Sequence, residues 1–113
     1  MNAYLNGFDR KEVTLNASAT AKEGNTVNLL NKSMVGSSPA DTNFIGVCSA
    51  IRKGLASVVL RGYVTVSFSG ETPSLGYNKI ASNGTGGIKL SDSGRYILVA
   101  DVDLVNDTCG IIL

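Results

Sequence analysis

The stretch from Leu55 to Phe68 alternates between apolar and polar side chains, and this pattern constrains the fold more than any other feature. A period of two residues predicts a β-strand with one buried and one solvated face. Gly62 lies in the middle of the run, so we expect a bulge or bend there that lets the strand curl or pass between two sheets. The residues expected to point inward are Ala56, Val58, Leu60, Gly62, Val64, Val66 and Phe68.

The rest of the chain also predicts short strands separated by turns. The Asn83–Gly84 pair predicts a hairpin, because both residue types accept positive φ. Residues 31–33 and 36–41 predict loops, and no segment has a helical period, so we expect no parallel crossovers. Residues 27–30 are a short apolar segment. The expected strands are 12–21, 44–51, 77–81, 87–90, 96–105 and 109–113, with Val13, Leu15, Ala17, Ala19, Leu98, Ala100, Val102 and Leu104 inward.

These patterns predict an all-β fold, either a small β-barrel or a sandwich, with an extended N-terminal arm. The chain has 113 residues, of which 43% are hydrophobic, enough for one domain with its own core. We expect an arm over residues 1–11 and a single β domain over residues 12–113.

The charge and the residue types argue against several functions. The net charge of +1 supports neither nucleic-acid nor membrane binding. The chain has no histidine, so nucleophile systems that need a histidine base are absent, and we expect no enzyme. Cys48 and Cys109 predict two small buried side chains, although a disulfide between them stays an alternative. The N-terminal residues do not resemble a signal peptide, so we expect folding in a cytoplasm.

Carboxylates offer the best remaining chemistry. Asp101 and Asp103 share a strand face at a separation of about 7 Å, which an inverting glycosidase could use. With Asn106 and Asp107 they also suggest a calcium site, but the spacing matches no dedicated loop. A solvated strand face explains these residues better, so we expect no catalytic residue, cofactor or metal.

Several apolar side chains are expected at positions where the domain core cannot cover them, which suggests an interface with a partner. Three lie in the arm, others are expected to face outward from their strands, and one belongs to the C-terminal run. The candidate capsid or subunit interface is Tyr4, Leu5, Phe8, Val59, Ile97, Val99 and Ile112.

The order of these strand patterns over residues 43–113 resembles the small capsid decoration proteins of tailed bacteriophages. The matching segments are Phe44–Val47, Ala56–Val66, Tyr77–Ile80, Gly94–Asp103 and Gly110–Leu113. The resemblance implies a β-barrel-like protomer, often trimeric, that sits on the outside of an icosahedral shell and clamps neighbouring subunits of the major capsid protein. It also implies synthesis in the host bacterial cytoplasm and a final place on the virion surface.

Two other classes of function stay open. One is another phage structural part, such as a tail-tube, head-completion or baseplate component. The other is a small carbohydrate- or surface-binding module that uses Tyr63, Tyr77 and Tyr96.

Overall fold

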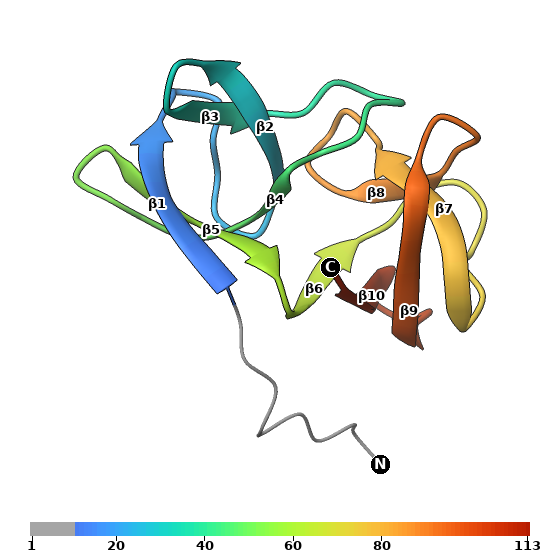
Figure 1. Ribbon diagram of the computed structural model, residues 1–113. Helices are drawn as coiled ribbons and strands as arrows, with labels where there is room; N and C mark the ends of the chain where they lie inside the picture. The colour runs from blue at the N-terminus through green and yellow to red at the C-terminus, as the bar shows by residue number, and fades with distance from the viewer. Residues whose placement is uncertain (1–10) are drawn as a thin grey trace.

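The computed structural model describes residues 11–113, which form two β-sheets and contain no helix (Figure 1). The first sheet closes into a barrel with the strand order β1-β3-β2-β4-β5, and the second is open with the order β6-β10-β9-β7-β8. The strands are β1 (Lys11–Ala17), β2 (Thr26–Asn31), β3 (Met34–Ser37), β4 (Gly46–Arg52), β5 (Leu55–Arg61), β6 (Tyr63–Ser67), β7 (Gly76–Ser82), β8 (Ile88–Leu90), β9 (Arg95–Asp103) and β10 (Thr108–Ile112). The all-β class predicted from the sequence is confirmed, and of the two predicted forms, a small barrel or a sandwich, the first sheet is a barrel. The expected arm lies outside the described residues except for Lys11, which opens β1.

The long alternating stretch passes from one sheet to the other at Gly62, which is one of the two arrangements that its sequence predicts. β5 ends at Arg61 in the barrel, and β6 begins at Tyr63 in the second sheet. Gly62 has a φ of 128°, a conformation that residues with a Cβ atom rarely adopt. The sharp corner between β5 and β6 in Figure 1 therefore depends on a glycine at this position.

Two hydrophobic cores result, and β4 and β5 form the wall between them. One core fills the barrel, and the other lies between the second sheet and the outside of this wall. The barrel core contains Ala21, Val27, Val35, Cys48, Ala56 and Val58, and the second core contains Phe44, Val47, Val59, Val64, Val66, Phe68, Ile80, Ile88, Ile97, Val99, Cys109 and Ile111. Both cysteines are buried and free, each in a different core, so the alternative of a disulfide between them is not realised.

The barrel differs from the sequence prediction in its closure. Residues 34–37, partly assigned to loops, form β3, which pairs in parallel with β1 through Asn16–Met34 and Ala17–Val35. The expectation of no parallel crossover is therefore wrong for this pair. A helix is not needed, because β2 alone connects the two strands and turns back into β3 at Ser33, whose φ is 57°.

The predicted hairpin around Asn83 and Gly84 is confirmed as β7–β8. Gly84 has a positive φ of 83°, whereas Asn83 acts through its side chain. Its Oδ1 atom accepts hydrogen bonds from the backbone N–H groups of Thr85, at 2.9 Å, and Gly87, at 3.0 Å. An asparagine that bonds the backbone ahead of it closes a turn in this way.

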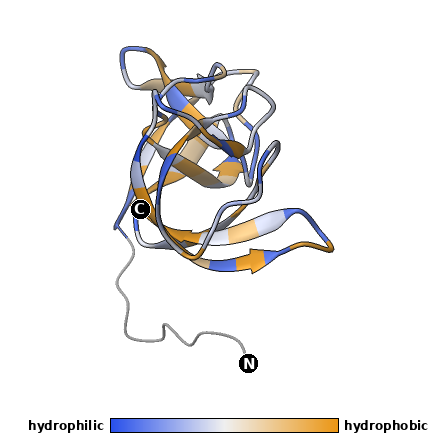
Figure 2. Ribbon diagram, turned by 90° about the vertical axis from the view of Figure 1, so that its right-hand side faces the viewer, coloured by the Kyte–Doolittle hydropathy of each residue, from blue (hydrophilic) through white to orange (hydrophobic). Residues whose placement is uncertain are grey.

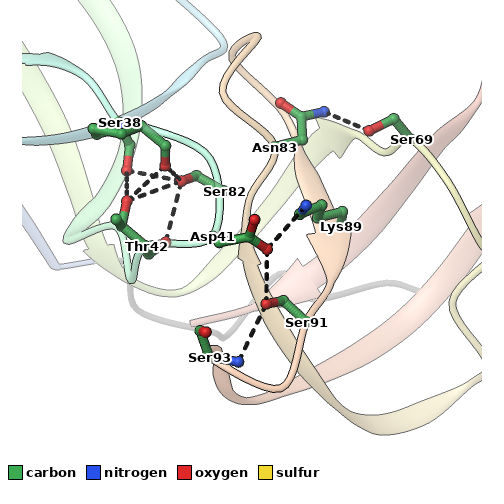
Figure 3. A network of polar contacts seen from close by, with 10 residues as sticks. Ser38, Asp41, Thr42, Ser69, Ser82, Asn83, Lys89, Ser91 and Ser93 are labelled. Carbon is green, nitrogen blue, oxygen red and sulfur yellow. Dashed lines mark hydrogen bonds and ion pairs between the residues drawn. The ribbon is translucent and has the colours of Figure 1, made fainter.

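A polar network joins the segment after β3 to this hairpin (Figure 3). The backbone N–H of Asp41 donates to the Ser82 carbonyl, and that of Ser82 donates to the Thr42 carbonyl, both at 3.0 Å. Lys89 Nζ lies 2.9 Å from Asp41 Oδ1, and this ion pair, together with a hydrogen bond from Ser91, lowers the pKa of Asp41. The barrel and the second sheet are therefore joined by this polar network as well as by the packing against β4 and β5.

Candidate interaction surface

The second sheet presents a row of large side chains on the face turned away from its core. Tyr63 of β6 lies opposite Ile112 of β10. Ile112 lies opposite Leu98 of β9, which in turn lies opposite Tyr77 of β7. Residues directly opposite each other on neighbouring strands project on the same face. The row therefore crosses four strands in register.

A second, shorter row lies beside the first. Tyr96 of β9 lies opposite Lys79 of β7, and Lys79 Nζ is 5.6 Å from the centre of the Tyr96 ring. That distance allows an attraction between the ammonium group and the aromatic ring. We call Tyr63, Tyr77, Tyr96, Leu98 and Ile112 together the outer face.

Tyr63 is held flat against the sheet by a glycine on the neighbouring strand. A Cβ atom at Gly110 would lie 2.1 Å from the Tyr63 hydroxyl oxygen and 2.6 Å from Cζ. The ring therefore occupies the space that a side chain at position 110 would fill. Glycine at position 110 therefore allows the position of the Tyr63 ring, which forms one end of the outer face.

Two tyrosines of the outer face are largely exposed to solvent, and its other three side chains are partly exposed. Tyr77 and Tyr96 are 70% and 67% exposed, whereas Tyr63, Leu98 and Ile112 are half-buried. Figure 2 turns toward the viewer the side of the molecule on which the second sheet lies in Figure 1. Neighbouring aromatic and aliphatic side chains that remain partly or largely accessible on one face of a sheet are typical of a surface that contacts another molecule.

The structure corrects three of the seven predicted interface residues. Val59, Ile97 and Val99 are at most 3% exposed and belong to the second core. Val59 faces the second sheet because both faces of the β4–β5 wall are covered. Leu60, expected inward, is 37% exposed, because the β1–β5 register shifts there. Val59, Ile97 and Val99 therefore stabilise the fold and are not accessible to a partner.

The side-chain directions on β9 are opposite to the prediction as far as Ala100. Ile97 and Val99 point into the core, whereas Leu98 points out. The register with β10 then shifts between Gly110 and Ile111, which leaves Ala100 as an extra residue. Such a bulge reverses the alternation, so Val102 packs against the core as predicted while Ala100 and Leu104 are exposed.

The remaining predicted interface residues have different outcomes. Ile112 does face away from the core, as expected, and lies in the middle of the outer face. Tyr4, Leu5 and Phe8 lie outside the described residues. The sequence indicates Tyr63, Tyr77 and Tyr96 only for the carbohydrate alternative, and the structure places all three on one face of the second sheet.

The Asp103 carboxylate stabilises the β9–β10 turn through its hydrogen bonds. Asp103 Oδ1 accepts from the backbone N–H of Val105 at 2.9 Å, and Oδ2 accepts from the Asn106 side-chain amide at 2.8 Å. These hydrogen bonds, that of the Asn106 amide foremost, lower the pKa of Asp103. Within residues 11–113 no group of three histidine, cysteine or acidic side chains is placed to hold a metal ion.

Neither protein-family models nor curated proteins match this chain. No helix in the described part of the chain is long and apolar enough to cross a membrane.

Proposed function

We propose that this protein binds the outside of a bacteriophage capsid and stabilises the expanded shell by clamping neighbouring capsid subunits. The observation that carries the proposal is the outer face, an in-register row of tyrosine and aliphatic side chains that lie outside both hydrophobic cores. The resemblance of residues 43–113 to capsid decoration proteins supplies the class of partner, the major capsid protein.

A rigid sheet suits a clamp of this kind. The backbone of the outer face is fixed by hydrogen bonds to neighbouring strands, and the sheet is supported from behind by the second core. Little conformational entropy is then lost when the face meets a shell, which favours binding. A protein that binds only the assembled lattice stabilises that state by mass action. On such a lattice the chain would sit as a homotrimer with neighbouring copies.

Co-sedimentation tests this proposal. Purified protein is mixed with undecorated, expanded phage shells and centrifuged, and the bound fraction is measured against protein concentration. We expect saturable binding and a higher temperature of shell disruption. Protein that stays in the supernatant at all concentrations would contradict the proposal.

The convergence of Tyr63, Tyr77 and Tyr96 on one face supports a second candidate, a carbohydrate-binding module. Exposed aromatic rings on the face of a sheet can stack against the apolar faces of sugar rings. A glycan array distinguishes the two candidates, because a decoration protein that uses this face only for the shell gives no hits.

A further inference from the structure

The turn between β9 and β10 presents two large apolar side chains to solvent. Leu104 and Val105, which we call the apolar tip, are 67% and 91% exposed and belong to neither hydrophobic core. The turn is fixed by Asp103, whose carboxylate accepts hydrogen bonds from the backbone N–H groups of Val105, at 2.9 Å, and Asn106, at 3.3 Å. A surface that is already ordered loses little conformational entropy when another molecule covers it.

Negative charge surrounds the apolar tip. Asp101 and Asp107 are exposed on either side of the turn, and Asp103 adds a third carboxylate. Residues 96–113 contain no lysine or arginine that could balance this charge. A surface that complements the tip is therefore apolar at its centre and basic at its rim.

The barrel has a hollow with an apolar lining on its outer side. The hollow has a volume of about 300 Å³ and extends over three strands, because Thr14 of β1 and Ala50 of β4 both lie opposite Ser57 of β5. Leu55 of β5 lies opposite Arg52 of β4 and is 46% exposed. The aliphatic part of a long basic side chain adds to such a lining. Because Leu55 and Ala50 are both exposed, the hollow offers apolar surface that another molecule can reach.

The rim of this hollow is basic at the β4–β5 turn. Arg52 and Lys53 line that end, and β4, β5 and the turn between them contain no aspartate or glutamate. Neither basic side chain forms an ion pair within the described part of the chain. The Glu12 carboxylate lies farther from the turn, opposite Val59, and accepts a hydrogen bond from a serine hydroxyl of β5 at 3.0 Å. The positive charge at the turn is therefore available to the carboxylates of another molecule.

We propose that the apolar tip of one copy binds the basic hollow on the barrel of a second copy, with the flanking carboxylates near Arg52 and Lys53. Figure 1 shows the β4–β5 turn at the left edge of the molecule and β9 and β10 in its right half, so the two surfaces do not meet within one chain. A contact between two different surfaces repeats head to tail and closes into a ring where the rotation between copies allows it. The negative charge around the tip disfavours an anionic lipid surface as the occupant. This inference does not depend on the proposed function, because association of copies is measured without shells.

Sedimentation equilibrium of the natural chain and of two surface variants tests the proposal. Leu104→Ser/Val105→Ser removes the apolar tip, and Arg52→Glu/Lys53→Glu reverses the charge of the hollow. All four residues are exposed, so both variants should fold, which circular dichroism checks. We expect the mean mass of the natural chain to rise with concentration, and each variant alone to associate at least about tenfold more weakly. The matched control Leu29→Ser removes an exposed leucine that belongs to neither surface, and it is expected to associate as the natural chain does.

A mixture of the two variants tests whether the surfaces are each other's partners. The tip variant keeps an intact hollow, and the hollow variant keeps an intact tip. We therefore expect an equimolar mixture to form complexes of two chains and no larger ones, since only one intact contact remains.

Any of three outcomes would overturn the proposal. The first is a natural chain that stays monomeric at every concentration, whether or not it binds shells. The second is a variant of either surface that associates as strongly as the natural chain. The third is a mixture of the two variants that contains no complexes of two chains.

Discussion

Val58 and Val59 are neighbours in β5, yet their side chains are buried in two different hydrophobic cores. Val58 points into the barrel, and Val59 points toward the second sheet, and both are fully buried. Cys48 and Val47 on β4 have the same relationship. Because the two cores share this wall, we expect the barrel and the second sheet to unfold together.

Replacing Val59 tests whether this residue belongs to a core or to an interface. We expect Val59→Ala to lower the free energy of unfolding by about 2 kcal/mol, through lost apolar burial and the cavity left behind. Urea unfolding followed by circular dichroism measures the change. The matched variant Leu60→Ala removes a partly exposed neighbour and should cost less. Equal effects of the two variants would contradict the assignment of Val59 to the core.

Gly94 lies where the chain presses against the backbone of β7. A Cβ atom at this position would meet the carbonyl carbon and oxygen of Ile80 at 2.4 Å. Backbone atoms of a paired strand cannot move aside, so we expect Gly94→Ala to cost about 3 kcal/mol in thermal or urea unfolding. Gly70→Ala is the control, since that position is open and only its φ of 74° is unfavourable, at about 1 kcal/mol. If Gly94→Ala were as stable as the control, the backbone of β7 at Ile80 would have to move aside, which would contradict the prediction.

The exposed tyrosines test the role of the outer face. We expect Tyr77→Ser/Tyr96→Ser to weaken shell binding by at least about tenfold, because aromatic side chains dominate most interfaces. The unfolding free energy should change little, since both rings are mostly exposed. Leu29→Ser is the control, because it removes an exposed leucine from the barrel instead. Equal binding by both variants in the co-sedimentation experiment would remove the outer face from the proposed function.

Alternation of side chains located strands well, but it could not assign faces where both faces are covered. The pattern around Gly62 predicted a bulge or bend at which the chain curls or passes between two sheets, and the structure shows the second, with β5 and β6 on either side of Gly62. Along β9 both parities are apolar, so the period of two residues does not distinguish Ile97 from Leu98. The bulge at Ala100 and the shared wall behind Val59 depend on pairing with distant strands, which no local pattern contains. The outer face was missed for the same reason, since its row joins residues from four strands.

Acid should weaken the β9–β10 turn through Asp103. Its pKa is lowered from 3.8 in the folded protein, so the charged form stabilises the fold above that value. This contribution is lost as the pH falls through the lowered folded pKa. We expect the unfolding free energy to fall between about pH 5 and about pH 2, and to fall less in Asp103→Asn, whose amide oxygen can still accept from Val105. Urea titrations across this range measure both slopes, and identical slopes would contradict the role of the charge.

The two cysteines report on the two cores separately. Burial raises the pKa of Cys48 in the barrel, and it raises the pKa of Cys109 in the second core to about 11. Only the thiolate is nucleophilic, so we expect neither residue to react with iodoacetamide in the native protein at pH 8, while both react in denaturant.

Labelling with iodoacetamide at rising urea concentrations, followed by mass spectrometry, then shows in which order the cores open. Because β5 belongs to both cores, we expect Cys48 and Cys109 to become reactive at the same urea concentration. The variants Cys48→Ser and Cys109→Ser assign each mass increase to one residue. Modification of one cysteine well before the other would show that the barrel and the second sheet unfold independently, despite the wall that carries Val58 and Val59.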